Sequence, residues 1–255
     1  MNESLCKRVV ELAEEAGRAI LTVYHSGSFD VSRKADASPL TEADLLSHSI
    51  IEKGLRSLTP DAPVLSEESV GIEVATRRAW GTFWLVDPLD GTKEFIKRNG
   101  EFTVNIALIE DGCPVFGVVV APVLERTYYG GVETPSVRID TDGTHSISCC
   151  PRRRPLKIVS SRSHPSPEQE AFLNSLGPHE CIPMGSSLKI CLVAEGTADF
   201  YPRLGPTMEW DIAAAHAVVL GAGGQLTQLE GEAVKYNKLD LLNPHFLVSN
   251  GEPLS

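Results

Sequence analysis

The stretch "WLVDPLDGTKEF" (residues 84–95) joins a run of apolar residues to two carboxylates, Asp87 and Asp90, that lie three residues apart. The continuous apolar run predicts a buried strand up to Asp87. Asp90-Gly91 alone predicts only a turn. The same dipeptide occurs in "ALIEDGCPVFGVVV" (residues 107–120), between two strand patterns where nothing indicates chemistry. The function of the first stretch therefore depends on the residues around it.

Two carboxylates beside a turn at the end of a strand favour a site for a cation and a phosphate. Gly91 allows the chain to turn with backbone N–H groups exposed, and Pro88 stiffens the link between the carboxylates. If a short helix begins at Gly91, its N-terminal end favours an anion. The carboxylates would repel a phosphate unless Mg²⁺ lay between them, since Mg²⁺ binds carboxylate, phosphate and water oxygens. Metal-assisted hydrolysis of a phosphate ester requires this combination of groups.

Composition restricts the class of protein. A chain of 255 residues, 42% hydrophobic and 22% charged, is typical of a globular protein with one large or two modest domains. No apolar run approaches the roughly 20 residues that cross a bilayer, and the N-terminus has no signal-peptide pattern. We therefore expect a cytoplasmic protein, with peripheral attachment to the inner membrane as an open alternative. The net charge of −11 argues against nucleic-acid binding, and the six cysteines have no metal-site spacing, which predicts reduced thiols.

Apolar periodicity predicts two helices and then strands in the first half of the chain, and alternating strands and helices in the second. The expected helices are at about residues 3–25, 41–58, 167–176, 186–195 and 209–220. The expected strands are "APVLSEE", "GTFWLVDP", "FTVNIALIEDG", "CPVFGVVVAP", "TYYGGV", "LKIVSS", "ADFYPR", "QLTQL" and "FLVSN". The turn-rich stretch at residues 140–155 is the predicted boundary between an N-terminal α+β domain (residues 1–150) and a C-terminal α/β domain (residues 151–255). We interpret its basic run, Arg152–Arg154, as a solvated linker.

Three other stretches contain acidic residues that could complete a metal site, and each also has a structural explanation. Glu67 and Glu68 follow a strand pattern but would also suit a solvated loop. Asp211 lies in the first turn of a predicted helix, where any carboxylate is favourable. Asp44 follows Thr41 with the spacing of a capping box. None of these residues alone distinguishes a site from local structure.

Considered together, "SEES" (residues 66–69), "WLVDPLDGTKEFI" (84–96) and "EWDIAAAHAV" (209–218) resemble the inositol monophosphatase-like family of Mg²⁺-dependent, lithium-sensitive phosphatases. "SPLTEADLLSH" (38–48) fits the N-terminal region of that family. The resemblance covers nearly the whole chain and keeps the order and spacing of the motifs. It implies a two-part α+β and α/β sugar-phosphatase fold, layered αβαβα, with the site between the halves.

The resemblance also implies a role for each matching residue. The implied metal ligands are Glu67, Asp87, the Leu89 carbonyl, Asp90 and Asp211. They would hold two Mg²⁺ ions, with a third, weaker ion placed with the help of Glu67. Gly91 and Thr92 would offer backbone N–H groups to phosphate, and the Thr92 hydroxyl, paired with Asp44, would position and deprotonate the attacking water. The resemblance further implies catalysis without a covalent intermediate, and the absence of a convincing Ser-His-Asp or Cys-His pattern agrees with this. His216 is interpreted as a helix-face residue.

The residues after the Asp-Pro-Leu-Asp-Gly-Thr motif indicate the substrate. "KEF" (93–95) and "NGEFT" (99–103) are similar to the 3'(2'),5'-bisphosphate nucleotidase branch of the family, as are "VSSRSH" (159–164), "PMGSSLKICLVAEG" (183–196) and "ADFYPRLGPTMEWD" (198–211). The resemblance to this branch implies hydrolysis of 3'-phosphoadenosine 5'-phosphate (PAP), a by-product of sulfate assimilation, to AMP. The predicted partner is thus a small phosphorylated nucleotide.

A substrate with two phosphates needs cationic partners besides the metals. The candidate substrate contacts are Lys189 and Arg203 for the second phosphate, Ser161, Arg162, Ser163 and Ser186 for sugar or phosphate, Tyr201 for the base, and Glu67, Leu89, Asp90, Gly91, Thr92 and Asp211 beside the metals. Lys189 could instead be a helix-face lysine, Arg203 an ion-paired residue and Tyr201 a core residue. Inositol monophosphate or fructose 1,6-bisphosphate as substrate, and a non-catalytic nucleotide or metal sensor, are the alternative functions.

Overall fold

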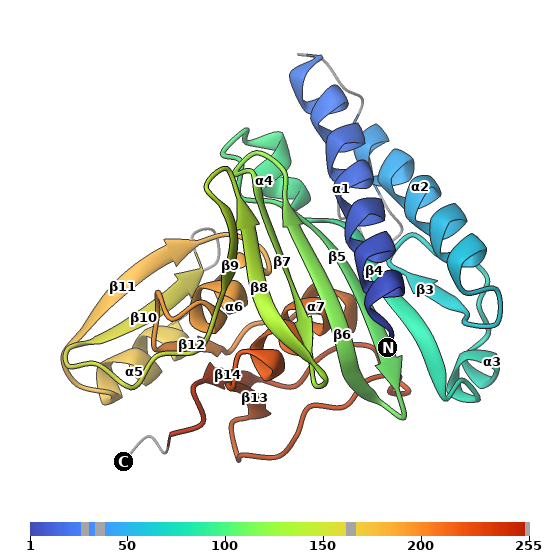
Figure 1. The fold of residues 1–255 in the computed structure, drawn as a ribbon. Helices are drawn as coiled ribbons and strands as arrows, with labels where there is room; N and C mark the ends of the chain where they lie inside the picture. Colours follow the sequence, from blue (N-terminus) through green and yellow to red (C-terminus); the bar gives the residue numbers. More distant parts are fainter. Residues whose placement is uncertain (27–30, 34–38, 162–166, 253–255) are drawn as a thin grey trace.

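The computed structural model describes residues 1–26, 31–33, 39–161 and 167–252, which form two main sheets and the helices that cover them (Figure 1). The helices are α1 (Glu3–His25), α2 (Glu42–Leu58), α3 (Val74–Arg78), α4 (Thr92–Ile96), α5 (Pro167–Ser175), α6 (Leu188–Ala194) and α7 (Glu209–Gly221). The strands are β1 (Val31–Arg33), β2 (Pro39–Thr41), β3 (Val64–Ser66), β4 (Thr82–Asp90), β5 (Thr103–Glu110), β6 (Cys113–Ala121), β7 (Arg126–Gly131), β8 (Thr134–Asp140), β9 (Gly143–Ser146), β10 (Leu156–Ser161), β11 (His179–Met184), β12 (Phe200–Arg203), β13 (Gln225–Gln228) and β14 (Phe246–Ser249).

The larger sheet contains seven strands in chain order, from β3 to β9. β3 and β4 are parallel, and the strands from β4 onward are antiparallel to their neighbours. Asp111 and Gly112 join β5 to β6 with φ values of 48° and 74°. Positive φ at both positions is typical of a tight hairpin turn. This Asp-Gly pair is therefore a plain turn, as its sequence context indicates.

Both faces of the larger sheet are buried, and the alternation along β4 explains how. Trp84 and Val86 pack in a core with α1 and α2, whereas Phe83 and Leu85 pack in a second core with α6 and α7. Successive side chains of a strand point to opposite faces, so a strand covered on both sides needs a continuous apolar run. Figure 1 shows α1 and α2 on one side of the sheet and α7 on the other.

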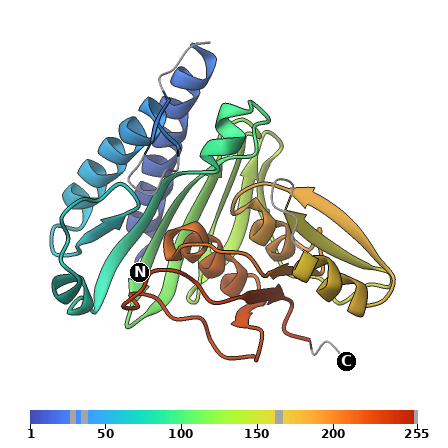
Figure 2. The same ribbon diagram turned by 180° about the vertical axis from the view of Figure 1, so that it is seen from behind.

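The smaller sheet has the strand order β11-β10-β12-β14-β13 and carries α5 on its outer face (Figure 2). Ile158 of β10 and Phe200 of β12 pack with Leu173 of α5. Their neighbours Val159 and Tyr201 face the core that contains α6 and α7. The layers are thus helices, sheet, helices, sheet and helix, which confirms the αβαβα fold implied by the resemblance.

The predicted helices and strands are present, but the sequence pattern does not predict every edge strand. β8 ends at Asp140 and β9 occupies Gly143–Ser146, so the predicted boundary stretch begins with a hairpin. The side chains of β9 and β11 are largely exposed or half-buried, and such strands lack a clear apolar alternation. The strands of the larger sheet all precede the predicted boundary at 150/151, and those of the smaller sheet all follow it. The division into two domains stays a prediction.

The basic run is not simply solvated. Arg153 Nε lies 3.1 Å from Asp199 Oδ1, and Arg153 Nη2 donates to the Gly196 carbonyl at 2.9 Å. The interpretation as a solvated linker is therefore wrong for Arg153. The cysteines are free thiols, as expected, and among the described residues no helix combines the length and apolarity needed to cross a membrane.

Candidate active site

One cavity of about 290 Å³ brings together the predicted metal ligands and substrate contacts. The predicted residues that line it are Glu67, Asp87, Leu89, Asp90, Gly91, Thr92, Ser161, Ser186, Lys189, Tyr201, Arg203 and Asp211. Asp44 is buried but is not part of the lining. Arg162 and Ser163 lie outside the described residues. The shared cavity supports the proposed set, while the role of each residue stays a prediction.

A β-bulge turns Asp87 and Asp90 toward the same cavity. Residues three apart in a regular strand point to opposite faces of a sheet. In the pairing of β4 with β5, Asp87 lies opposite Asn105 and Asp90 lies opposite Thr103, so β4 contains one extra residue between the two carboxylates. A bulge of this kind re-aims the following side chain. The three-residue spacing of the carboxylates thus suits a bulged strand end.

Gly91 is required where β4 turns into α4. Its φ of 92° lies in the left-handed region, and a Cβ atom at this position would lie 2.1 Å from Ser186 Oγ. Glycine is the residue that adopts this backbone without steric cost. α4 begins at Thr92 with Gly91 as its N-cap, so the condition that a short helix follows the turn is met.

Asp44 both caps α2 and reaches the cavity through Thr92. Its Oδ2 accepts the backbone N–H of Thr41 at 2.8 Å and the Thr41 hydroxyl at 2.5 Å, so the capping explanation is confirmed. Its other oxygen, Oδ1, lies 3.4 Å from Thr92 Oγ1. The two explanations of Asp44 are therefore compatible, since each uses a different oxygen.

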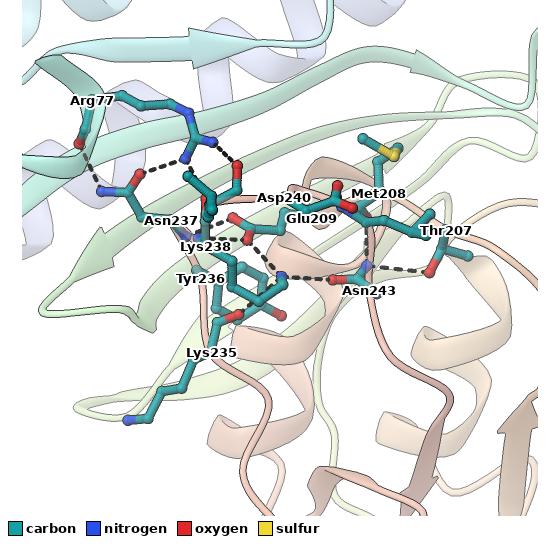
Figure 3. Close-up of polar contacts among 12 residues, drawn as sticks. Arg77, Thr207, Met208, Glu209, Lys235, Tyr236, Asn237, Lys238, Asp240 and Asn243 are labelled. Carbon is teal, nitrogen blue, oxygen red and sulfur yellow. Dashed lines mark hydrogen bonds and ion pairs between the residues drawn. The ribbon is translucent and has the colours of Figure 1, made fainter. Parts of the chain in front are cut away.

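Asp211 is supplied by the first turn of α7, and a buried polar network holds that turn (Figure 3). Asp211 Oδ2 accepts the N–H of Met208 at 2.8 Å. Glu209, which is 0% exposed, accepts the N–H groups of Asn237 and Lys238 at 2.6 and 3.0 Å and the Lys238 ammonium at 2.6 Å. The segment that contains Asn237 and Lys238 is thereby attached to the start of α7.

Arg77 of α3 extends this network (Figure 3). Its guanidinium donates to Asn237 Oδ1 at 3.0 Å and to the carbonyls of Lys238 and Leu239 at 2.6 and 2.7 Å. The Asn237 amide donates back to the Arg77 carbonyl at 2.7 Å. A planar guanidinium with several donors suits such a cluster of acceptors. The sequence contains no local signal for this contact, because the partners lie 160 residues apart.

The predicted metal ligands repel one another. Burial raises the pKa of Asp87 well above its usual range, and the charges of Glu67, Asp90 and Asp211 raise it further. Burial also raises the pKa of Asp90 to about 6, against the opposing charge of Lys189. Burial, together with repulsion from Asp90, raises the pKa of Asp211.

A divalent cation would offset this repulsion. Among the described residues, no three His, Cys, Asp or Glu side chains form a compact group that could hold an ion as they stand. The carboxylates nevertheless line one cavity together with Leu89, and carboxylate and carbonyl oxygens are the ligands that Mg²⁺ prefers. The donor set therefore fits a hard divalent cation.

The cavity also contains two cationic side chains, Lys189 and Arg203. Burial lowers the pKa of Lys189 to about 8, while Asp90 favours its charged form. Lys189 Nζ lies 5.8 Å from the centroid of the Tyr201 ring. Tyr201 is 2% exposed and packs in the core as well as lining the cavity, and Arg203 Nη2 donates to the Pro206 carbonyl at 2.9 Å. Lys189 is thus a cavity residue rather than a lysine on an exposed helix face.

Other residues complete the lining. They are Lys93, Glu94, Gly185, Ser187, Ile190, Thr207 and Ile212. All but Thr207 adjoin a predicted site residue or lie two positions from one, so extending the motifs by two residues would have included them. Thr207 enters through the loop before α7, where Asn243 Nδ2 donates to its hydroxyl at 3.1 Å.

His216 of α7 is buried in the protein interior and does not line the cavity. Its Nδ1 lies 2.8 Å from the Tyr236 hydroxyl, and burial lowers its pKa to about 3. In the unfolded chain this histidine binds a proton below about pH 6.5, whereas in the folded protein it stays neutral. The contribution of His216 to the free energy of unfolding is therefore present above that pH and is lost as the pH falls.

We expect His216→Gln to reduce the acid sensitivity of the protein. Between pH 7 and pH 5 the wild-type free energy of unfolding should fall by about 2 kcal/mol because of this group alone. Urea denaturation at both pH values would measure the difference between variant and wild type. His25→Gln, which changes an exposed histidine, is the matched control, and equal pH dependence of all three proteins would contradict the assignment.

The sequence matches the family model described as the inositol monophosphatase family over residues 1–254. The chain belongs to the inositol monophosphatase family. This is a family of metal-dependent phosphatases. Among its members, a Salmonella typhimurium protein named 3'(2'),5'-bisphosphate nucleotidase CysQ is 50% identical over 248 residues, which cover 96% of this chain and 99% of that protein. The protein of the same name from Escherichia coli K12 is 51% identical over 245 residues, covering 95% and 98%.

A solved structure of a family member supports the fold. The crystal structure of CysQ from Bacteroides thetaiotaomicron superposes with a TM-score of 0.88 at 43% identity and covers 98% of each chain. The layered architecture of this chain is therefore that of the inositol monophosphatase family.

Proposed function

We propose that the protein hydrolyses the 3'-phosphate of PAP, giving AMP and phosphate, as part of sulfate assimilation in the cytoplasm. The observation that carries this proposal is that one cavity joins the carboxylates of β4 and α7 to Lys189 and Arg203. A bisphosphorylated nucleotide has a second phosphate besides the one that is cleaved, and cationic side chains in the same cavity suit it. The relatives named 3'(2'),5'-bisphosphate nucleotidase at about half identity support the same substrate.

The proposed cofactor is Mg²⁺, with two ions and a third, weaker one per site. The residues that would hold it are Glu67, Asp87, the Leu89 carbonyl, Asp90 and Asp211. Bound Mg²⁺ supplies charge neutralisation at the phosphate and at the leaving oxygen. Asp90 Oδ2 accepts the backbone N–H of Ser187 at 2.6 Å and Asp211 Oδ2 accepts that of Met208 at 2.8 Å, so we expect Oδ1 of each carboxylate to face the metal.

Asp44, Thr92 and Gly91 are proposed to act on the water and the phosphate. Thr92 Oγ1 lies between the cavity and Asp44 Oδ1. It would accept the proton of the attacking water and pass its own to Asp44, which is a general-base arrangement. The donors from Thr41 hold Oδ2 of Asp44 and leave Oδ1 directed at Thr92. The N–H groups of Gly91 and Thr92 would bind the phosphate that is cleaved.

The nucleotide side is proposed to come from the second half of the chain. Lys189 and Arg203 would pair with the second phosphate, and Ser161 and Ser186 would contact sugar or phosphate. Tyr201 would adjoin the base with the edge that lines the cavity. In this proposal residues 1–150 form the domain that carries most metal ligands, and residues 151–255 form the domain that completes the site.

Phosphate release from PAP, inositol 1-phosphate and fructose 1,6-bisphosphate, measured side by side, tests the proposal. We expect a preference for PAP of at least about tenfold in kcat/KM, loss of turnover in EDTA, and inhibition by millimolar Li⁺, as is typical of the family. Preference for either of the other esters would overturn the roles of Lys189, Tyr201 and Arg203. Metal-dependent nucleotide binding without phosphate release would indicate a sensor instead.

A further inference from the structure

The segment before α6 holds the Asp90–Gly91 turn from the other half of the chain. The backbone N–H of Ser187 donates to Asp90 Oδ2 at 2.6 Å, across 97 positions of sequence. The Ser186 hydroxyl contacts the Asp90 carbonyl at 2.9 Å and the Glu101 carbonyl at 2.7 Å. The position of the Asp90 side chain therefore depends on this segment as well as on β4.

Three buried side chains form a polar cluster around Asp90 Oδ2: Thr103, Asn105 and Ser187, which are 0%, 1% and 3% exposed. Ser187 Oγ donates to Asn105 Oδ1 at 2.8 Å, and Thr103 Oγ1 lies 2.9 Å from Ser187 Oγ. Asn105 Nδ2 and Thr103 Oγ1 each lie 3.5 Å from Asp90 Oδ2. Buried polar groups of this kind need partners, and the cluster supplies them.

The direction of these hydrogen bonds orients Asn105. A serine hydroxyl has one hydrogen, and Ser187 donates it to Asn105 Oδ1. The amide nitrogen then faces the Asp90 carboxylate as a donor. A flipped amide would place Asn105 Oδ1 against that carboxylate, where two acceptors repel each other. The Asp90 carboxylate therefore favours the orientation in which Asn105 donates to it, and the Ser187 hydroxyl stabilises this orientation by donating to the amide oxygen.

We propose that Ser187 is a positioning residue of the metal site, which acts through Asn105 to hold Asp90 with Oδ2 toward the protein and Oδ1 toward the cavity. It thereby raises the affinity of the site for a divalent cation. This inference rests on the proposed role of Asp90 as a metal ligand. Partners that orient a metal ligand typically change metal affinity by about 10- to 100-fold when they are removed.

Calorimetric titration of the substrate-free protein with Mg²⁺ tests this role without measuring turnover. We expect Ser187→Ala to raise the dissociation constant by about tenfold and Ser187→Thr, which keeps the hydroxyl, to restore most of the affinity. Ser136→Ala is the matched control, because Ser136 is also buried and its hydroxyl donates to the Val218 carbonyl at 2.7 Å away from the cavity. The control should leave the dissociation constant within about twofold while losing a comparable hydrogen bond.

A double-mutant cycle distinguishes positioning from general loosening. If Ser187 acts through Asn105, Ser187→Ala should add little to the loss of Mg²⁺ affinity already caused by Asn105→Ala. Additive losses, an unchanged dissociation constant in folded Ser187→Ala, or no Mg²⁺ binding by the wild type would overturn the inference. Mg²⁺ binding with the expected Ser187 effect but without PAP hydrolysis would overturn the proposed substrate and leave the positioning role intact.

Discussion

Asp90→Asn is expected to lower kcat/KM for PAP by at least about 10³-fold while leaving the fold intact. Asparagine has the shape of aspartate and can still accept the Ser187 N–H, so the local hydrogen bonds survive. It lacks the negative charge that the proposed metal site requires. Steady-state phosphate release with saturating Mg²⁺ would measure the loss.

Although its activity falls, the Asp90→Asn variant is expected to have a higher free energy of unfolding than the wild type when metal is absent. Because burial raises the pKa of Asp90 to about 6, its ionised form opposes folding at neutral pH in the absence of metal. Thermal unfolding in EDTA at pH 7.5 should show Asp90→Asn to be more stable than the wild type, by about 1–3 kcal/mol. Asp142→Asn, which removes an exposed carboxylate at the β8–β9 turn, should change neither activity nor stability. Retained turnover in Asp90→Asn would contradict the metal assignment.

Glu209→Ala is expected to lower the free energy of unfolding by about 3 kcal/mol, at the lower end of the range for breaking a buried charge pair. Removal of this carboxylate leaves the N–H groups of Asn237 and Lys238 without their acceptor. The Lys238 side chain is 27% exposed, and water therefore compensates part of the lost ion pair. Urea denaturation would measure the change.

The position of Glu209 also predicts an effect on activity. Glu209 lies two residues before Asp211 in the first turn of α7, so loosening this turn should weaken the metal site as well as the fold. Glu209→Gln, which keeps one acceptor oxygen, should lose less stability than Glu209→Ala. Glu230→Ala removes an exposed carboxylate and should stay within about 0.5 kcal/mol of the wild type. A Glu209→Ala protein as stable as this control would show that the network contributes nothing.

Much of the fold is readable from local sequence patterns. The continuous apolar run of β4 indicated a buried strand, and apolar periodicity indicated the two helices that are observed as α1 and α2. The Thr41–Asp44 spacing predicted the cap of α2 that is observed. Edge strands such as β9 and β11 were not readable, since strands that bury few side chains carry little hydrophobic pattern.

The candidate site was also predictable only in part from the sequence. The Asp-Pro-Leu-Asp-Gly-Thr motif and the Trp-Asp helix start identified the carboxylates, because their residue types and order are visible in the chain. The bulge that turns Asp87 and Asp90 to one side was not visible, since it depends on the pairing of β4 with β5.

The residues that hold the site in position could not be predicted from the sequence either. Ser187 meets Asp90 across 97 positions and Arg77 meets Asn237 across 160. Periodicity and capping act over a few residues, so the sequence shows which elements form and which side chains carry chemistry. Contacts over such separations arise only when the two sheets pack around α6 and α7, and that packing brings the Ser187 N–H to Oδ2 of Asp90.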